Sequence, residues 1–119
     1  MPLEATMGAC LFCDIISGAI PAERSYEDDQ CIAISDIAPK APVHLLILPR
    51  EHFSSADGLD ASREKLAGHL VHVAAQLARS RGLDARGYRL VFNHGSDAGQ
   101  TVQHLHLHLL GGRALDGMC

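Results

Sequence analysis

The sequence predicts an α+β domain, with an antiparallel meander sheet of about five strands and one long and one short helix packed on one side of it. Several short stretches rich in β-branched residues are separated by turn residues, which is the pattern of strands joined by short loops. Only residues 60–81 have the apolar spacing of a long helix. Residues 104–110 alternate between histidine and leucine, which indicates a strand with one buried face.

The length of 119 residues predicts a single domain spanning 1–119, in which residues 1–9 form a loose N-terminal tail. The chain is 47% hydrophobic and 20% charged, and its net charge is −4 with neutral histidines. This composition is ordinary for a soluble globular protein. Because lysine and arginine form no long run in the sequence, we expect no nucleic-acid polymer as a partner.

The N-terminal ten residues contain neither a basic region nor an apolar run, so we expect no signal peptide. The longest apolar run, residues 41–49, is too short to span a membrane. Four cysteines do not make a disulfide framework in a domain of this size. We therefore expect a cytoplasmic protein with reduced thiols and no membrane partner.

The first half of the chain predicts a short helix and three strands. The short helix, residues 10–18, is closed by Gly18. Two short strands, residues 25–27 and 31–35, flank the turn residues Asp28 and Asp29. A proline-stiffened loop then leads to a strand over residues 43–48.

The second half predicts the long helix and two more strands. Asp60 or Ser62 is the expected N-cap, and the helix ends at Gly82. One apolar stripe along this helix consists of Leu66, Leu70, Val73 and Leu77. We expect His69 and His72 of this helix to face solvent or the edges of the helix, and we assign them no chemistry. The remaining strands are residues 88–93 and 104–110, joined by a glycine-rich loop.

The alternation in the last strand places three imidazoles, those of His104, His106 and His108, on one face. Neighbouring histidines on such a strand stand about 6.7 Å apart, and the outer two about 13 Å apart. A zinc–nitrogen bond is only about 2 Å long, so one ion cannot readily bind all three. The row is better suited to proton transfer and phosphate contact.

Neutral imidazole can attack a phosphoryl centre near pH 7, through a covalent intermediate on the histidine. His106 is flanked on both sides and is the natural nucleophile, while its neighbours can bind phosphate oxygens or protonate the leaving group. His44 is a fourth imidazole that could reach the same cleft. The loop over residues 95–101 supplies two glycines and two hydroxyl groups, which favours a phosphate cradle.

Cys10 and Cys13 form a C-x-x-C half-site for zinc, for which His52 and His104 are the candidate further ligands. Two alternatives remain for this pair. A redox pair lacks the expected βαβ context, and two buried thiols are the other interpretation. Asp36 follows a strand, and its carboxylate is either a loop cap or a partner for a ribose diol.

These motifs resemble the histidine triad (HIT) superfamily, and in particular its Hint branch of histidine triad nucleotide-binding proteins. The signature is residues 104–110, and the flanking Gly99-Gln100-Thr101 and Gly111-Gly112-Arg113 resemble the same branch. The resemblance continues through residues 20–22, 27–29, 35–44 and 87–89. It implies a HIT-like fold whose sheet extends across a homodimer.

The resemblance also implies an enzyme that hydrolyses purine nucleoside phosphoramidates, such as AMP joined to an amine, through a nucleotidyl-histidine intermediate. By this resemblance the catalytic residues are His106, His108, His104, His44 and Thr101. The substrate-binding residues it implies are Leu11, Phe12, Ile15, Ile34, Asp36, Ile37, Asn93, Gly99, Gln100, Thr101, His106 and His108. The ligands would be AMP, GMP and their phosphoramidates, and catalysis would require no cofactor.

Two departures from the branch affect these expectations. Many Hint proteins lack the cysteine pair, whereas other bacterial members of the superfamily hold a structural zinc with such a pair and two histidines. The C-terminal residues 114–119 lack the tryptophan–proline ending of many relatives, which leaves the preferred amine open. The alternative functions are hydrolysis of dinucleoside polyphosphates, a zinc-dependent hydrolase, and a nucleotide-binding module with little turnover.

Overall fold

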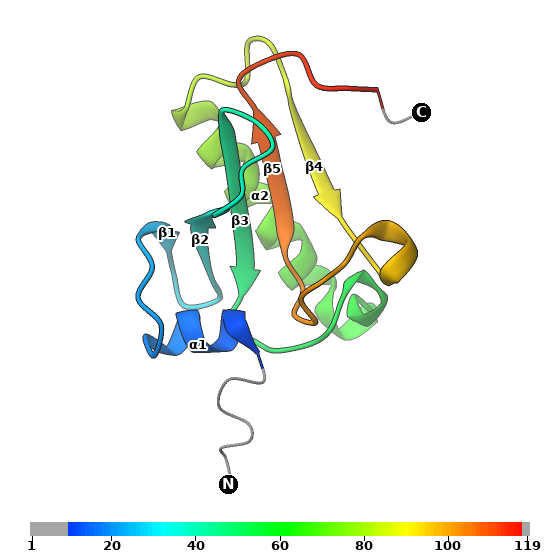
Figure 1. The fold of residues 1–119 in the computed structure, drawn as a ribbon. Coiled ribbons are helices and arrows are strands. Elements are labelled where there is room, and N and C mark those ends of the chain that lie inside the picture. Colours follow the sequence, from blue (N-terminus) through cyan, green and yellow to red (C-terminus); the bar gives the residue numbers. More distant parts are fainter. Residues whose placement is uncertain (1–9, 118–119) are drawn as a thin grey trace, which may run out of the picture.

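The computed structural model describes residues 10–117, and the predicted tail over residues 1–9 lies outside the described residues. Figure 1 shows one twisted sheet crossed by a long helix, with a short helix at one end of the sheet. The helices are α1 (Leu11–Ser17) and α2 (Glu64–Ser80). The strands are β1 (Arg24–Glu27), β2 (Cys31–Ser35), β3 (Val43–Pro49), β4 (Tyr88–Phe92) and β5 (Leu107–Gly111). Short 3₁₀ turns span Ala56–Gly58, Ala61–Arg63 and Ser96–Ala98.

The predicted α+β class and five-stranded antiparallel sheet are confirmed. The strand order is β1-β2-β3-β5-β4. Strands β1 to β3 follow one another as in the predicted meander, but β4 and β5 do not. The last strand, β5, inserts between β3 and β4 and becomes a central strand. The histidines of β5 therefore lie in the middle of the sheet, and β4 is left as an edge.

The prediction that both helices pack on one side of the sheet is wrong. Ala33, Leu45 and Ile47 belong to the core under α2. Ile32 and Leu46, their neighbours along the same strands, pack with α1 on the opposite face. Since successive side chains of a strand point to opposite faces, the largely buried strands β2 and β3 contribute to a core on each side of the sheet. The short helix thus shares its face of the sheet with the histidines.

The predicted strand over residues 104–110 is too long at its start, because β5 begins at Leu107. The amide of Leu105 donates to the carbonyl of Phe53, at 2.8 Å, and not to a neighbouring strand. The side-chain alternation nevertheless continues through the irregular segment, since Leu105, Leu107 and Leu109 are all buried under α2.

The turn between β1 and β2 is fastened to α2 by Asp28. Its carboxylate accepts hydrogen bonds from the amides of Gln30 and Cys31 and from the hydroxyl of Tyr26. The same carboxylate lies 2.7 Å from Nε2 of His69, which is half-buried at the edge of α2 and paired with this turn. Within the described part of the chain, no helix is long and apolar enough to cross a membrane.

Candidate active site

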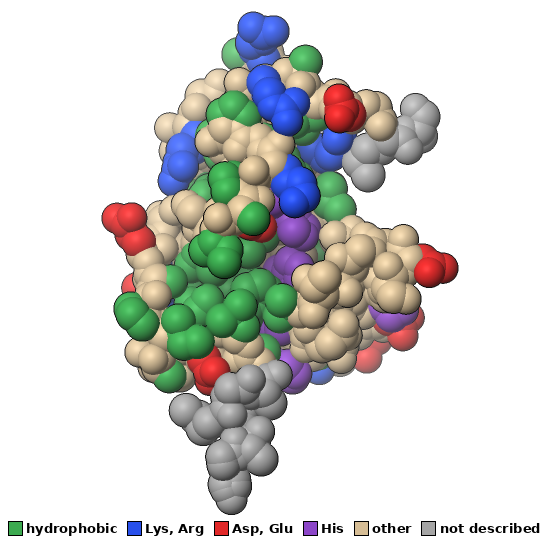
Figure 2. Space-filling model, in the orientation of Figure 1, with side chains coloured by type: hydrophobic (Ala, Val, Ile, Leu, Met, Phe, Trp, Pro, Cys, Tyr) green, Lys and Arg blue, Asp and Glu red, His purple; other side chains and the backbone are tan. Residues whose placement is uncertain are grey.

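A cavity of about 590 Å³ opens on the face of the sheet that carries α1. In Figure 2 a line of histidine side chains lies between an apolar patch and the rest of the surface. The predicted site residues that line this cavity are Leu11, Phe12, Ile15, Ile34, Asp36, Ile37, His44, Asn93, Gly99, Thr101, His106 and His108. The structure thus brings together all the predicted substrate-binding residues except Gln100. Ile37 stands at the rim and is 97% exposed.

His106 presents one ring nitrogen to this cavity in the form that a nucleophile requires. Its Nδ1 atom lies 2.7 Å from the carbonyl oxygen of His104. A carbonyl oxygen only accepts hydrogen bonds, so Nδ1 carries the proton and Nε2 keeps its lone pair. Phe12 packs edge-on against the ring, with 5.1 Å between the ring centroids, and helps to hold its orientation.

His108 and His44 form a hydrogen-bonded relay with a fixed direction. The backbone amide of Lys40, which only donates, lies 3.1 Å from Nδ1 of His44. The proton of neutral His44 is therefore on Nε2, which lies 2.9 Å from Nδ1 of His108. This leaves the proton of His108 on Nε2, a buried atom without a partner among the described residues. The relay ends in a donor at the wall of the cavity.

The electrostatic environment keeps both imidazoles of the relay neutral at pH 7. Burial, followed by the nearby His106 and His44, lowers the pKa of His108 to about 4. Burial also lowers the pKa of His44, although the carboxylate of Asp36 opposes this effect. That carboxylate lies 3.5 Å from Nε2 of His44. Its other oxygen caps the loop by accepting from the amide of Ala38, at 2.8 Å.

The glycine-rich loop differs in detail from the predicted phosphate cradle. The amides of Gly99 and Gln100 donate to the carbonyls of Ser96 and Gly95 within the loop itself, so they are not free for a ligand. The hydroxyl and amide of Thr101 make no hydrogen bond within residues 10–117. Thr101 is therefore the group of this loop that is available to an anion in the cavity.

Gln100 is absent from the cavity, because its side chain points into the protein and is 8% exposed. Its Oε1 accepts from the amide of Gly95 at 2.9 Å. Its Nε2 donates to the carbonyls of Ser54 and Val102, at 2.6 and 3.0 Å. The side chain thus ties the loop to itself and to the segment after β3, and its amide is directed away from the cavity.

His104 also lies away from the cavity, and its imidazole is completely buried. Its Nε2 lies 2.9 Å from the carbonyl of Pro49, so Nδ1 carries a lone pair. That lone pair is directed at the other three candidate zinc ligands, Cys10, Cys13 and His52. A role for His104 in proton transfer to substrate therefore has no support from its position.

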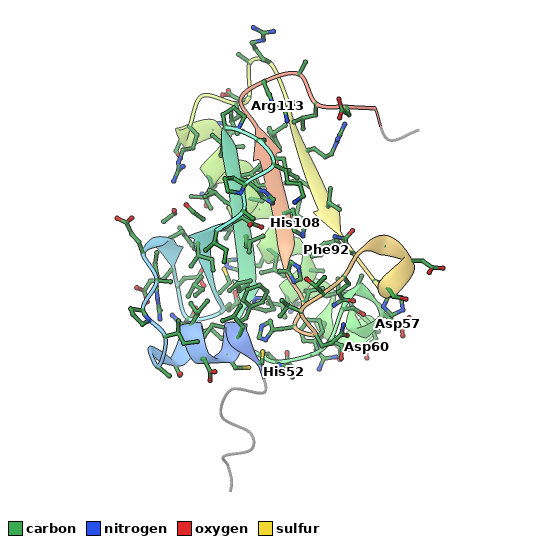
Figure 3. All side chains as sticks on the ribbon, in the orientation of Figure 1. His52, Asp57, Asp60, Phe92, His108 and Arg113 are labelled. Atoms are coloured by element: carbon green, nitrogen blue, oxygen red, sulfur yellow. The ribbon has the colours of Figure 1, made fainter. Side chains whose placement is uncertain are left out.

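The four candidate ligands have the spacing of a tetrahedral site. Zinc–ligand bonds of about 2.1 Å to nitrogen and 2.3 Å to sulfur give tetrahedral edges of about 3.4–3.8 Å. The two histidine Nδ1 atoms lie 3.1 Å apart, and Nδ1 of His104 lies 3.4 and 3.6 Å from Sγ of Cys10 and Cys13. Sγ of Cys13 lies 3.3 Å from Nδ1 of His52. The residues therefore fit a zinc ion, and Figure 3 shows His52 beside sulfur atoms at the start of α1.

The chemistry of this cluster agrees with its spacing. The hydrogen bond from His104 to Pro49 is the outer contact that orients a metal-binding imidazole. Burial and the neighbouring Cys10 raise the pKa of Cys13 to about 11, so this thiol is protonated at pH 7 unless a cation binds it. Cys10 also caps α1, since its sulfur accepts from the amide of Cys13.

Lys40 was not among the predicted site residues, although its amide directs the histidine relay and the residue lines the cavity. A main-chain hydrogen bond leaves no signal in the residue type, so no sequence pattern could have identified it. His94 was also missed: its Nδ1 lies 2.5 Å from Oγ of the buried Ser55 and adds a second tie to the glycine-rich loop.

Comparisons with known proteins show the family to which the chain belongs. The family model of the HIT domain matches residues 17–115. An uncharacterized HIT-like protein of Synechococcus elongatus is 47% identical over 105 residues, covering 88% of this chain and 91% of the relative. The purine nucleoside phosphoramidase of Escherichia coli is 41% identical over 108 residues, covering 91% of both chains.

Solved structures agree. A HIT family hydrolase from Legionella pneumophila matches with a TM-score of 0.88 and 46% identity, covering 90% of this chain and 96% of that chain. A zinc-bound histidine triad family protein from Mycobacterium smegmatis matches with a TM-score of 0.75 and 36% identity, covering 87% and 75%. The predicted HIT-like fold is confirmed, and the chain belongs to the HIT domain family.

Proposed function

We propose that this protein hydrolyses purine nucleoside phosphoramidates through a covalent nucleotidyl intermediate on His106. The observation that carries the proposal is the pair of complementary nitrogens in one cavity: a lone pair on Nε2 of His106 and an N–H on Nε2 of His108. Membership of a family whose relatives include named hydrolases and a purine nucleoside phosphoramidase supports it.

The chemistry follows from these two nitrogens. Nε2 of His106 attacks the phosphorus, and the phosphorus–nitrogen bond breaks with its electron pair leaving on the amine. The N–H of His108, which His44 orients, donates a hydrogen bond to the phosphoryl oxygens and stabilises the charge that develops on them, while the departing amine takes a proton from water. The hydroxide that this step leaves then attacks the phosphorus, and the bond to Nε2 of His106 breaks with its electron pair returning to the imidazole, which releases the nucleoside monophosphate. This route requires no cofactor.

The nucleotide itself is expected to lie across the same cavity. Apolar side chains of α1 and β2, including Phe12, Ile15 and Ile34, would cover the two faces of a purine. Asp36 would accept hydrogen bonds from the ribose hydroxyls, and Thr101 would contact the phosphate. These apolar side chains offer no hydrogen bond that would distinguish adenine from guanine, so both AMP and GMP are proposed ligands.

The test is intact-protein mass spectrometry during turnover of an AMP–amine conjugate. We expect a nucleotidyl adduct in the wild type that is absent from His106→Ala, while the variant still binds AMP. His72→Ala is the matched control, because His72 is an exposed histidine of α2 outside the site. An adduct or full turnover in His106→Ala would contradict the proposal. AMP binding without turnover in the wild type would indicate a binding module.

We further propose that Cys10, Cys13, His52 and His104 hold a structural zinc ion. The spacing of the four ligand atoms and the zinc-bound relative support this proposal. Zinc there would stabilise the junction of α1 with the rest of the domain. Elemental analysis should find about one zinc per chain in the wild type and in Cys31→Ala, whose thiol lies in the core, but none in Cys13→Ser. Equal zinc content in all three proteins would refute the site.

A homodimer that extends the sheet is also proposed, with β4 as its interface. β4 is an edge strand of an otherwise continuous sheet, and edge strands present unpaired backbone groups to a partner. Two copies paired about a two-fold axis would bring like residues close together. Val91→Lys would therefore place two charges at the interface, and sedimentation should show a monomer. Val71→Lys, at an exposed position of α2, is the control and should stay dimeric.

A further inference from the structure

The basic side chains of this acidic protein are unevenly distributed. The chain has ten lysines and arginines and a net charge of −4. Six of the ten lie where β3 begins and β5 ends, at the C-terminal end of α2: Lys40, Arg79, Arg81, Arg86, Arg89 and Arg113. Figure 2 shows several of these blue side chains at the top of the molecule, and Figure 3 labels Arg113 there, far from His52.

None of these six cations forms an ion pair with a carboxylate within the described residues. By contrast, Arg24, Arg50 and Arg63 each pair with an acidic side chain elsewhere in the protein. The guanidinium group of Arg113 donates only to the carbonyls of Lys40 and Ala114, and that of Arg89 to the carbonyl of Asp116. These contacts orient the side chains without neutralising their charge.

Three of the arginines line a groove of about 690 Å³, which we call the arginine groove. Its lining residues are Arg81, Gly82, Leu83, Arg86, Gly87, Gly112, Arg113 and Ala114. A smaller hollow of about 270 Å³ continues from it along Arg86 and Arg113 to Arg89. Neither is lined by an aspartate or glutamate. The groove therefore concentrates unneutralised positive charge in one concave surface.

The backbone of the arginine groove also suits the close approach of a ligand. Gly82, Gly87 and Gly112 have φ angles of 73°, 109° and 100°, a region that other residues rarely adopt. These glycines make sharp bends that bring the arginine-bearing segments together.

We propose that the arginine groove is a second ligand site that binds a small anion carrying two or more phosphoryl groups. Guanidinium groups bind phosphate through paired hydrogen bonds, and several arginines in one concave surface match several phosphoryl groups. No aromatic side chain lines the groove itself, whereas single-stranded nucleic acids are held by stacking on aromatic rings. The site is separate from the histidine cavity and does not depend on the proposed hydrolase activity.

The test is titration calorimetry of the full-length protein with inorganic tripolyphosphate at low ionic strength. Arg86→Gln removes one charge from the groove, and Lys65→Gln removes one charge from an exposed position at the other end of α2. We expect Arg86→Gln to weaken binding about tenfold, the usual effect of losing a charge-assisted contact. Lys65→Gln should weaken it less than twofold. A Thr101→Ala variant, altered in the histidine cavity, should bind tripolyphosphate at the groove as the wild type does.

Three results would overturn the proposal. Absence of tripolyphosphate binding by the wild type would show that the groove has no phosphate affinity. An equal loss in Arg86→Gln and Lys65→Gln would show non-specific attraction by net charge. Tighter binding of a hexadeoxyadenylate strand than of tripolyphosphate, lost in Arg86→Gln, would make the ligand a nucleic acid.

Discussion

Replacement of Gln100 by alanine separates the two roles that this residue could have. In the structure its buried amide makes three hydrogen bonds, to Gly95, Ser54 and Val102, and none to the cavity. A typical intramolecular hydrogen bond contributes about 0.5–1.5 kcal/mol to stability, so the three together contribute about 1.5–4.5 kcal/mol. Gln100→Ala should therefore lower the free energy of unfolding by that amount.

The measurement is urea denaturation of the variant, together with AMP titration of the folded protein. Because the same bonds shape the loop before Thr101, we expect the affinity for AMP to fall several-fold along with stability. Gln103→Ala is the matched control, since Gln103 is exposed and forms no side-chain hydrogen bond within residues 10–117. It should change the free energy of unfolding by less than about 0.5 kcal/mol.

One combination of results would contradict the structural role of Gln100. If Gln100 contacted the phosphate directly, its removal would weaken AMP binding while leaving the free energy of unfolding unchanged. An unchanged stability would therefore mean that the three hydrogen bonds do not hold the loop.

Three further predictions concern other parts of the molecule. His44→Ala removes the donor behind His108 and should lower kcat about a hundredfold or more, whereas Lys40→Ala, which keeps the backbone amide, should preserve it; equal effects would contradict the relay. Removal of the proposed zinc by a chelator should weaken AMP binding in calorimetry, because α1 and its N-cap residue carry both candidate cysteine ligands, and α1 also forms one wall of the cavity; unchanged affinity would show that the two sites are independent. Burial opposes ionisation of Asp28, but hydrogen bonds from two amides, His69 and Tyr26 outweigh it and lower its pKa. These bonds therefore stabilise the folded state above about pH 4, the pKa of an unfolded aspartate, and this contribution declines as the pH falls further. Asp28→Asn should be less stable than wild type at pH 7 and should lose less stability on acidification; parallel curves would refute this.

The sequence predicted the elements of the fold well, because hydrophobic period and turn residues act locally. The strands β1 to β4 and the helix α2 lie within a few residues of their expected bounds. The position of β5 between β3 and β4 was not predictable in this way, since strand order depends on contacts between distant segments. The same holds for α1, whose place on the opposite face follows from packing of Phe12 and Ile15.

The site shows a similar division between local and distant information. Alternation in residues 104–108 indicated correctly that His106 and His108 would share a face, and both line the cavity. It could not show that His104 turns away to meet Cys10 and Cys13, because those ligands lie more than ninety residues earlier in the chain. Gln100 was assigned from its place in a motif, but the direction of its side chain depends on partners in Ser54 and Gly95.

The relay of His44 and His108 begins at the backbone amide of Lys40. This determines which substitutions the loop can accept at position 40. The backbone amide of residue 40 does not depend on the side chain at that position, so most substitutions there leave the tautomers of His44 and His108 unchanged. Proline is the exception, since it has no amide hydrogen. Prolines already occupy positions 39 and 42 on either side. A substitution of Lys40 by proline would remove the amide that directs the relay while leaving every histidine in place. A family member with proline at the position of Lys40 is therefore expected to lose activity although its histidines are intact.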